Sequence, residues 1–170
     1  MKEEFENIIR RRTAVRKYTN EVIEKDKLDK ILEAGRVAPT AMNLQPFKII
    51  VVQNEDNLKK IDLATNYRYG ATTVLIVCGN LNEAYTRGSY SSYEMDACIV
   101  GTHMMLEATN LDVDTVWVKA FDADIISREF ALPSELVPVF LLPLGYRASD
   151  CPENPKHNIR KSINELVEYR

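Results

Sequence analysis

The sequence predicts a mixed domain of the α+β or α/β class, in which helices are interleaved with about four strands. Two observations carry this prediction. Four short runs rich in apolar and β-branched residues are separated by longer segments whose apolar residues repeat at helical spacing. The chain also has 170 residues, the usual length of one domain, so residues 1–170 are expected to form a single one.

The first half of the chain is expected to hold three helices and two strands. Apolar residues three or four positions apart indicate the helices, and runs such as KIIVVQ indicate the strands. The second helix should end before Pro39, because the residue preceding a proline is disfavoured in the helical region. In order, the expected elements are a helix at 5–9, a helix at 28–35, an ordered loop at 38–47, a strand at 48–53, a helix at 56–64 and a strand at 73–78.

The second half begins with the polar, tyrosine-bearing and poorly patterned residues 80–92. The helix expected next is apolar nearly all round, which is typical of a helix buried at the centre of a domain. The last strand, VPVFLLPLG, contains two prolines and is therefore expected to be an edge strand or a bulged one. In order, these elements are a helix at 93–109, a strand at 114–119, a helix at 123–131 stopped by Pro133 and a strand at 137–145.

The tail at 148–170 has little apolar content to fix it to the rest of the chain. Such a segment is either frayed or held by something outside the compact core, such as a partner subunit. A short apolar pattern at 163–167 is its one regular feature.

Composition argues against several classes of protein. The formal net charge of -3 lacks the basic surplus of a dedicated nucleic-acid binder. Three cysteines without CxxC spacing, and only two histidines, predict no zinc site and fit a reducing cytosol. No secretory signal is recognised at the N-terminus, and no apolar stretch approaches the ~20 residues of a membrane helix. We therefore expect a cytoplasmic protein.

Two polar segments are candidates for chemistry, and the lack of nucleotide-loop, hydrolase or metal motifs favours a cofactor. Residues Arg10–Tyr18 include five cations in eight positions, and the arginine fork suits phosphate. A solvated charged face explains that cluster about equally well. Residues Ala38–Phe47 carry small hydroxyl and amide groups between two prolines, which suit the polar edge of a heterocycle. An ordinary helix-to-strand connection is the alternative there.

Together these segments resemble the nitroreductase family of FMN-dependent oxidoreductases. The matching motifs follow in the family's order along essentially the whole chain: Arg12–Tyr18, Ala38–Phe47, Thr115–Asp122, Leu142–Tyr146 and the basic tail segment Arg160–Leu166. The resemblance implies an α+β, nitroreductase-like fold with a central, mainly antiparallel sheet flanked by helices. It also implies a homodimer with FMN at the subunit interface and a C-terminal tail reaching across the dimer.

The resemblance assigns one group of residues to the phosphate end and the pyrimidine edge of FMN. Arg12 matches a phosphate-binding arginine, and Arg160 of the tail matches a second one. Thr13 and Ala14 match positions along the phosphate and ribityl chain. Arg16 matches the basic residue near flavin N1, where a cation favours the anionic reduced ring.

Other flavin contacts are expected from four more places. The loop after the second helix matches a segment given by the second subunit, and the end of the third strand matches backbone that faces flavin N5. A glycine after the last strand allows close approach, and the loop before the second strand adds one contact. These residues are Pro39, Thr40, Ala41 and Asn43; Trp117, Lys119 and Ala120; Gly145; and Asn66 or, as the alternative, Arg68. No catalytic side chain is expected, because the chemistry belongs to FMN.

The function implied is an FMN-dependent oxidoreductase that uses NADH or NADPH to reduce nitroaromatic, quinone or similar small acceptors. The cycle would be ping-pong, with hydride transfer through flavin N5. The chain departs from the family pattern at Ala14 and Ala41, where serine is frequent, at Lys119, where better-known members have glutamate or glycine, and at Asn158, where a cation is common.

Three alternatives stay open, and Ala14 and Lys119 leave room for the first of them. One is a flavin-binding sensor or storage protein without efficient turnover, and another is a specialised flavin enzyme such as a reductive dehalogenase. An adapter that binds a partner or nucleic acid through Arg10–Lys17 is a third. Tyr85, Tyr90 and Tyr93 would stack on a flat acceptor or, equally, lie at the surface.

Overall fold

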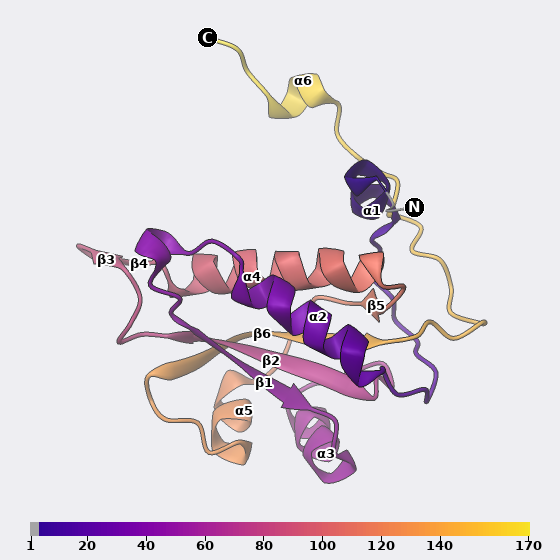
Figure 1. Cartoon of the computed structure of the whole chain (residues 1–170), viewed down its shortest axis with the longest axis horizontal. Coiled ribbons are helices and arrows are strands. Elements are labelled where there is room, and N and C mark those ends of the chain that lie inside the picture. Colours follow the sequence, from indigo (N-terminus) through magenta and orange to yellow (C-terminus); the bar gives the residue numbers. More distant parts are fainter. Residues whose placement is uncertain (1–3) are drawn as a thin grey trace.

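The computed structural model describes residues 4–170, and its centre is a four-stranded antiparallel sheet with helices on both faces (Figure 1). The strand order is β1-β2-β6-β5. All three neighbouring pairs are antiparallel, which confirms the expected α+β class. The strands are β1 Phe47–Val52, β2 Thr73–Asn80, β5 Asp114–Thr115 and β6 Leu136–Gly145.

Two apolar cores lie on opposite faces of the sheet. Helices α2 and α4 cover one face, and α3 and α5 cover the other (Figure 1). Strands β2 and β6 are apolar at nearly every position because both of their faces are covered. Alternation along β2 sends Leu75 to the α4 side and Ile76 to the α3 side. The helices are α1 Phe5–Arg11, α2 Lys25–Arg36, α3 Glu55–Ala64, α4 Tyr93–Asn110, α5 Ala123–Glu129 and α6 Ile163–Leu166.

Strand β6 is an interior strand, so the edge alternative for it is wrong and the bulge alternative is confirmed. Its neighbours are β2 and β5. The register with β2 shifts between Val77 and Cys78, which pair with Phe140 and Pro138. Val139 is therefore the extra, unpaired residue of a β-bulge.

Strand β5 is shorter than the expected strand at 114–119. The antiparallel register with β6 continues past Thr115, since Val118 still pairs with Leu141. Val116 N–H donates to Pro143 O at 3.2 Å, but Pro143 has no N–H and cannot donate a hydrogen bond in return. The ladder of hydrogen bonds to β6 is therefore interrupted, although the backbone continues in the same register.

Helix α4 is buried on one side only, so the expectation of burial all round is wrong. Val100 and Met104 are fully buried against α2 and the sheet. On the other side Met95 is 57% exposed, and Cys98 and Thr102 are exposed as well. An apolar helix face is thus left without cover in a single chain.

Two local differences concern turns. Residues 80–92, which had no clear pattern, contain a small hairpin of β3 Thr86–Arg87 and β4 Tyr90–Ser91. Its turn uses Gly88 at φ +62°. Helix α5 ends at Glu129 rather than at 131, because Ala131 takes φ +49° and cannot continue the helix.

The tail leaves the sheet, passes α1 and ends away from the rest of the chain (Figure 1). Its helix α6 has a capping box between Ser162 and Glu165, but its apolar residues are not covered. Ile163 is 67% exposed and Leu166 is 65% exposed. Within residues 4–170 no helix is long and apolar enough to cross a membrane.

Candidate active site

A pair of arginines from the two ends of the chain forms the first part of the site. Arg12, just after α1, is half-buried. Burial lowers the pKa of Arg12, and the nearby positive charge of Arg160 lowers it further. Among the described residues neither guanidinium has a carboxylate partner; Arg160 donates instead to Ile159 O at 2.8 Å. Two like charges near each other, neither with a carboxylate partner among the described residues, favour the binding of an anion.

The tail reaches Arg12 because it is tied to the N-terminal segment at two points. Lys17 forms an ion pair with Asp150. Further along, the His157 ring donates from Nε2 to Arg10 O at 3.0 Å. Between α1 and the tail lies an open hollow of about 550 Å³, with Arg160 in its wall. The sequence prediction that both arginines share one site is therefore consistent with where the fold places them.

A groove of about 180 Å³ forms the second part of the site. It contains four of the residues expected at the flavin, namely Arg16, Trp117, Lys119 and Ala120. The other lining residues are Tyr67, Tyr69, Val116 and Val118. The groove thus combines aromatic rings with two cations, and no lining residue carries a carboxylate.

The groove is built by the segment that continues β5. Val118 and Leu141 exchange two backbone hydrogen bonds of 2.9 Å, which fixes this segment against β6. Val15 N–H donates to Thr115 O at 3.0 Å, and this contact sets Arg16 beside the groove. The ring of Trp117 stacks on Phe140, with centroids 3.6 Å apart and planes 16° apart.

The Lys119 side chain is held by a hydrogen bond to a backbone carbonyl of β6. Its ammonium Nζ donates to Val139 O at 2.7 Å. Val139 is the bulge residue of β6, so a local irregularity of the sheet holds this cation in place.

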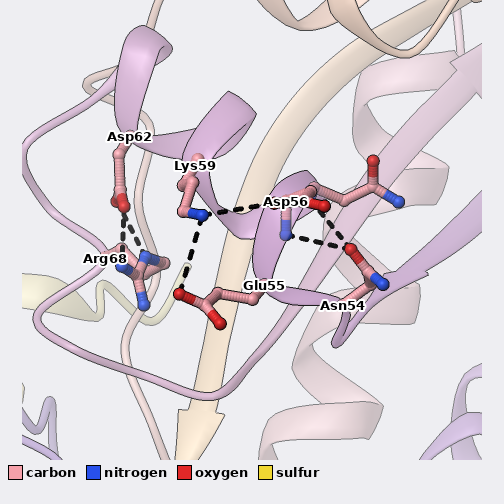
Figure 2. A network of polar contacts seen from close by, with 7 residues as sticks. Asn54, Glu55, Asp56, Lys59, Asp62 and Arg68 are labelled. Atoms are coloured by element: carbon pink, nitrogen blue, oxygen red, sulfur yellow. Dashed lines mark hydrogen bonds and ion pairs between the residues drawn. The ribbon is translucent and has the colours of Figure 1, made fainter.

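The loop before β2 reaches the groove through tyrosines that sequence reasoning missed. Tyr67 and Tyr69 line the groove, with ring centroids 5.9 Å apart, whereas Asn66 is exposed and does not line it. Figure 2 shows why Arg68 is not available either: it makes a two-pronged pair with Asp62, at 2.7 and 2.6 Å. The sequence did contain a signal for them: two aromatic residues stand two positions apart, in a loop that was already expected to contact the flat flavin ring.

The segment Pro39–Asn43 lies elsewhere, at the start of α4. The buried carboxylate of Asp96 accepts a hydrogen bond from Ala41 N at 2.8 Å and another from Ser92 Oγ at 2.7 Å. Thr40 Oγ1 accepts from Gln45 N at 3.0 Å. These bonds hold a loop in which Met42, Asn43 and Gln45 all have positive φ, between 51° and 56°.

Helix α4 separates this loop from the arginine pair. Asp96 holds the loop at the first turn of α4, and Arg11 donates to Thr109 O at 2.6 Å at its last turn. At 1.5 Å per residue these contacts are roughly 20 Å apart along the helix. One chain therefore does not bring Thr40, Ala41 and Asn43 to Arg12.

The remaining expected residues have mainly structural surroundings. Ala14 bridges to Thr115 in the sheet extension, and Thr13 lines a hollow of about 360 Å³ between Asp114 and the tail. Gly145 is buried, and a Cβ there would lie 3.0 Å from the ring of Tyr18. The group that closely approaches Gly145 is thus the Tyr18 ring of the same chain. Burial raises the pKa of Tyr18 well above its ordinary value, and its hydroxyl donates to Pro143 O at 3.3 Å.

With this geometry in view, comparison with known proteins identifies the class. The profile of the nitroreductase family matches residues 9–69 and 67–146, so the chain belongs to that family. A solved structure of a nitroreductase family protein from Clostridium difficile 630 has a TM-score of 0.92 and 37% identity, covering 98% of each chain.

Two curated relatives are named after redox activities. A protein of Methanothermobacter thermautotrophicus, provisionally named NADH dehydrogenase/NAD(P)H nitroreductase, is 30% identical over 156 residues, which are 86% of this chain and 77% of the relative. An FMN reductase [NAD(P)H] of Bacillus subtilis is 29% identical over 136 residues, which are 78% of this chain and 50% of the relative.

Proposed function

We propose that the protein is an FMN-dependent oxidoreductase that uses NADH or NADPH to reduce nitroaromatic, quinone or similar small acceptors. The observation that carries the proposal is the arginine pair: Arg12 and Arg160 lie near each other, and neither has a carboxylate partner in the part of the chain that the structure describes. The guanidinium fork suits a phosphate monoester, which can accept hydrogen bonds from both arginines. The names of the family's relatives, an NAD(P)H nitroreductase and an FMN reductase, support the same choice.

The groove fits the ring end of the same cofactor. Tyr67 and Tyr69 offer aromatic faces, and Trp117 extends the apolar wall. The guanidinium of Arg16 would stabilise negative charge on the pyrimidine edge when the ring is reduced. The backbone of Lys119 and Ala120 would face the reacting edge of the ring, as the resemblance implies.

FMN, when bound, supplies the redox chemistry, by carrying a hydride from NAD(P)H to the acceptor. In the net reaction a nitro group takes two electrons and two protons and becomes a nitroso group and water, while NAD(P)H becomes NAD(P)⁺. The hydride brings one of the protons and solvent supplies the other. A quinone takes the same two electrons and two protons and becomes a hydroquinone. The residues of the groove bind and orient; none of them is needed as a general acid.

We also propose that the working unit is a homodimer in which both chains contribute to each site. The loop at Pro39–Asn43 and the residue Arg12 lie at opposite ends of α4, too far apart to serve one flavin within a single chain. Antiparallel packing of α4 on its copy about a two-fold axis would bring the two ends together. The uncovered face of α4, with Met95 57% exposed, supports this arrangement.

An anaerobic visible spectrum tests the proposed function. Purified protein supplied with FMN should retain it on gel filtration, and NADH or NADPH should bleach the flavin band. Addition of a nitroaromatic or a quinone should then restore the band. Protein that retains no flavin refutes the proposal and favours the adapter. Flavin that is retained but not bleached favours the sensor or storage protein.

Sedimentation equilibrium tests the dimer separately. A stable dimer is expected at micromolar protein concentration. A stable monomer loaded with FMN would contradict the shared site.

A further inference from the structure

Lys119 has a position that the binding of FMN does not by itself explain. Its backbone belongs to the segment that lines the groove, while its side chain is exposed. The ammonium is anchored to the carbonyl of Val139, which is itself buried. A lysine side chain is otherwise free to rotate into solvent, so this anchor keeps the charge beside β6, on a residue that itself lines the groove.

The charge of Lys119 is held but not neutralised. The carbonyl of Val139 is a neutral acceptor, and within residues 4–170 Lys119 forms no ion pair with a carboxylate. On α4, burial raises the pKa of the Cys98 thiol, Glu94 adds to that rise and Lys119 opposes it, which places the ammonium near Cys98. Glu94 is thus an acid near Cys98, and it forms no ion pair with Lys119 among the described residues.

The two cations of the groove therefore have different tasks. Under the proposed function, Arg16 stabilises the negative charge that develops on the flavin ring itself. Lys119 has no ion-pair partner within residues 4–170, and it is the residue whose backbone would face the reacting edge of the ring. An acceptor must approach that edge to within about 3–3.5 Å for transfer to occur. Its substituents then lie within the electrostatic reach of Lys119.

We propose that Lys119 makes the acceptor pocket selective for aromatic acceptors that carry an anionic substituent, such as a ring carboxylate. The inference rests on the proposed function and names the substrate class of the same site. In the reaction the nitro group takes two electrons and two protons to become nitroso and water, NAD(P)H is oxidised, and the carboxylate is unchanged. The carboxylate contributes to binding and orientation only.

A pair of acceptors that differ in charge but hardly in shape gives the test. 4-Nitrobenzoate and 4-nitrobenzamide have the same ring and nitro group, and their substituents are nearly isosteric. We take two unit charges about 6 Å apart and an effective dielectric constant between that of a protein surface and that of water. Their attraction then corresponds to roughly a tenfold preference. We expect kcat/KM of the FMN-loaded protein to favour nitrobenzoate about tenfold at low ionic strength. The preference should decrease as salt is added.

Three variants connect the preference to Lys119. Lys119→Met removes the charge and keeps much of the length, so the ratio of the two kcat/KM values should fall to about one. Lys119→Arg keeps the charge and should keep the preference. Lys48→Met is the matched control, because Lys48 is an exposed cation on β1 that does not line the groove. It should leave the ratio as in the original protein.

Equilibrium binding supplies a second readout that does not depend on turnover. Benzoate and benzamide, which are not reduced, are titrated against the oxidised FMN-loaded protein and followed by the flavin absorbance. Benzoate should bind about tenfold more tightly, and Lys119→Met should abolish the difference. If that variant fails to fold, the salt dependence in the original protein decides the matter.

The outcomes separate this inference from the proposed function. Protein that holds FMN and reduces both acceptors equally well at low salt refutes the selectivity and leaves the function intact. A preference for nitrobenzoate that survives in Lys119→Met also refutes it. Protein that retains no FMN, or that reduces neither these two acceptors nor a quinone, refutes both.

Discussion

A single methyl group added at Gly101 gives a sharp test of how the site is packed. Gly101 lies in the middle of α4, over the stacked rings of Trp117 and Phe140. A Cβ in the Gly101→Ala variant would lie 2.3 Å from Phe140 Cζ and 2.7 Å from Trp117 Cζ3. Both distances are below any ordinary contact. Because the two rings are rigid and stacked on each other, neither can turn away without moving the segment that lines the groove.

The expected size of the effect follows from two opposing contributions. Alanine is favoured over glycine inside a helix by about 1 kcal/mol. Overpacking of a filled core costs about 1–3 kcal/mol, and contacts this short with rings belong at the upper end. The free energy of unfolding should therefore fall by about 1–2 kcal/mol. For a chain of this length that lowers Tm by about 2–8 °C.

Gly35→Ala is the matched control in the facing helix α2. There the new Cβ would meet Met104 Cγ at 2.9 Å and Met104 Sδ at 3.0 Å. A methionine side chain is flexible and can give way, so this variant should stay within about 1 kcal/mol of the original protein.

Urea unfolding measures both variants, at one protein concentration and one FMN concentration, since binding and association shift apparent stability. Trp117 is the only tryptophan of the chain, so its fluorescence reports on the perturbed stack itself. A Gly101→Ala protein as stable as the original would refute the packing argument. So would a Gly35→Ala protein that loses more stability than Gly101→Ala.

Three further predictions concern single groups. Replacing Arg12 or Arg160 by alanine should weaken FMN binding roughly 10- to 100-fold in a fluorescence titration, since each removes a charged hydrogen-bond donor; unchanged affinity would exclude that arginine from the phosphate site. Asp96→Ala should weaken FMN binding because Ala41 N–H loses its acceptor, and Asp96→Asn should recover part of the affinity; equal loss in both variants would argue against this role of Asp96 in holding the loop. Burial raises the pKa of the Cys78 thiol to about 12, so iodoacetamide at pH 8 should not label Cys78 until urea unfolds the protein; rapid labelling of the folded protein, seen by mass spectrometry, would contradict its burial.

The elements predicted from the sequence are those whose evidence is local. The continuous apolar run at Thr73–Cys78 indicated a buried strand, and β2 is covered on both faces. Helical spacing at 28–35 indicated α2, which begins three residues earlier and ends one residue later. Periodicity could not predict the length of β5, because that depends on the missing N–H of Pro143 in a strand later in the chain. Nor could it show that β6 is an interior strand, since that depends on its two neighbours.

The same division applies to the candidate site. The sequence by itself determined the basic N-terminal segment, the position of Lys119 and the family to which their order points. Only the tertiary structure decided that Arg160 lies beside Arg12, that Tyr67 and not Asn66 lines the groove, and that Lys119 is bonded to a bulge carbonyl. The physical reason is that local spacing records which face of a segment is buried. What a buried or anchored group meets there depends on segments far away in the sequence.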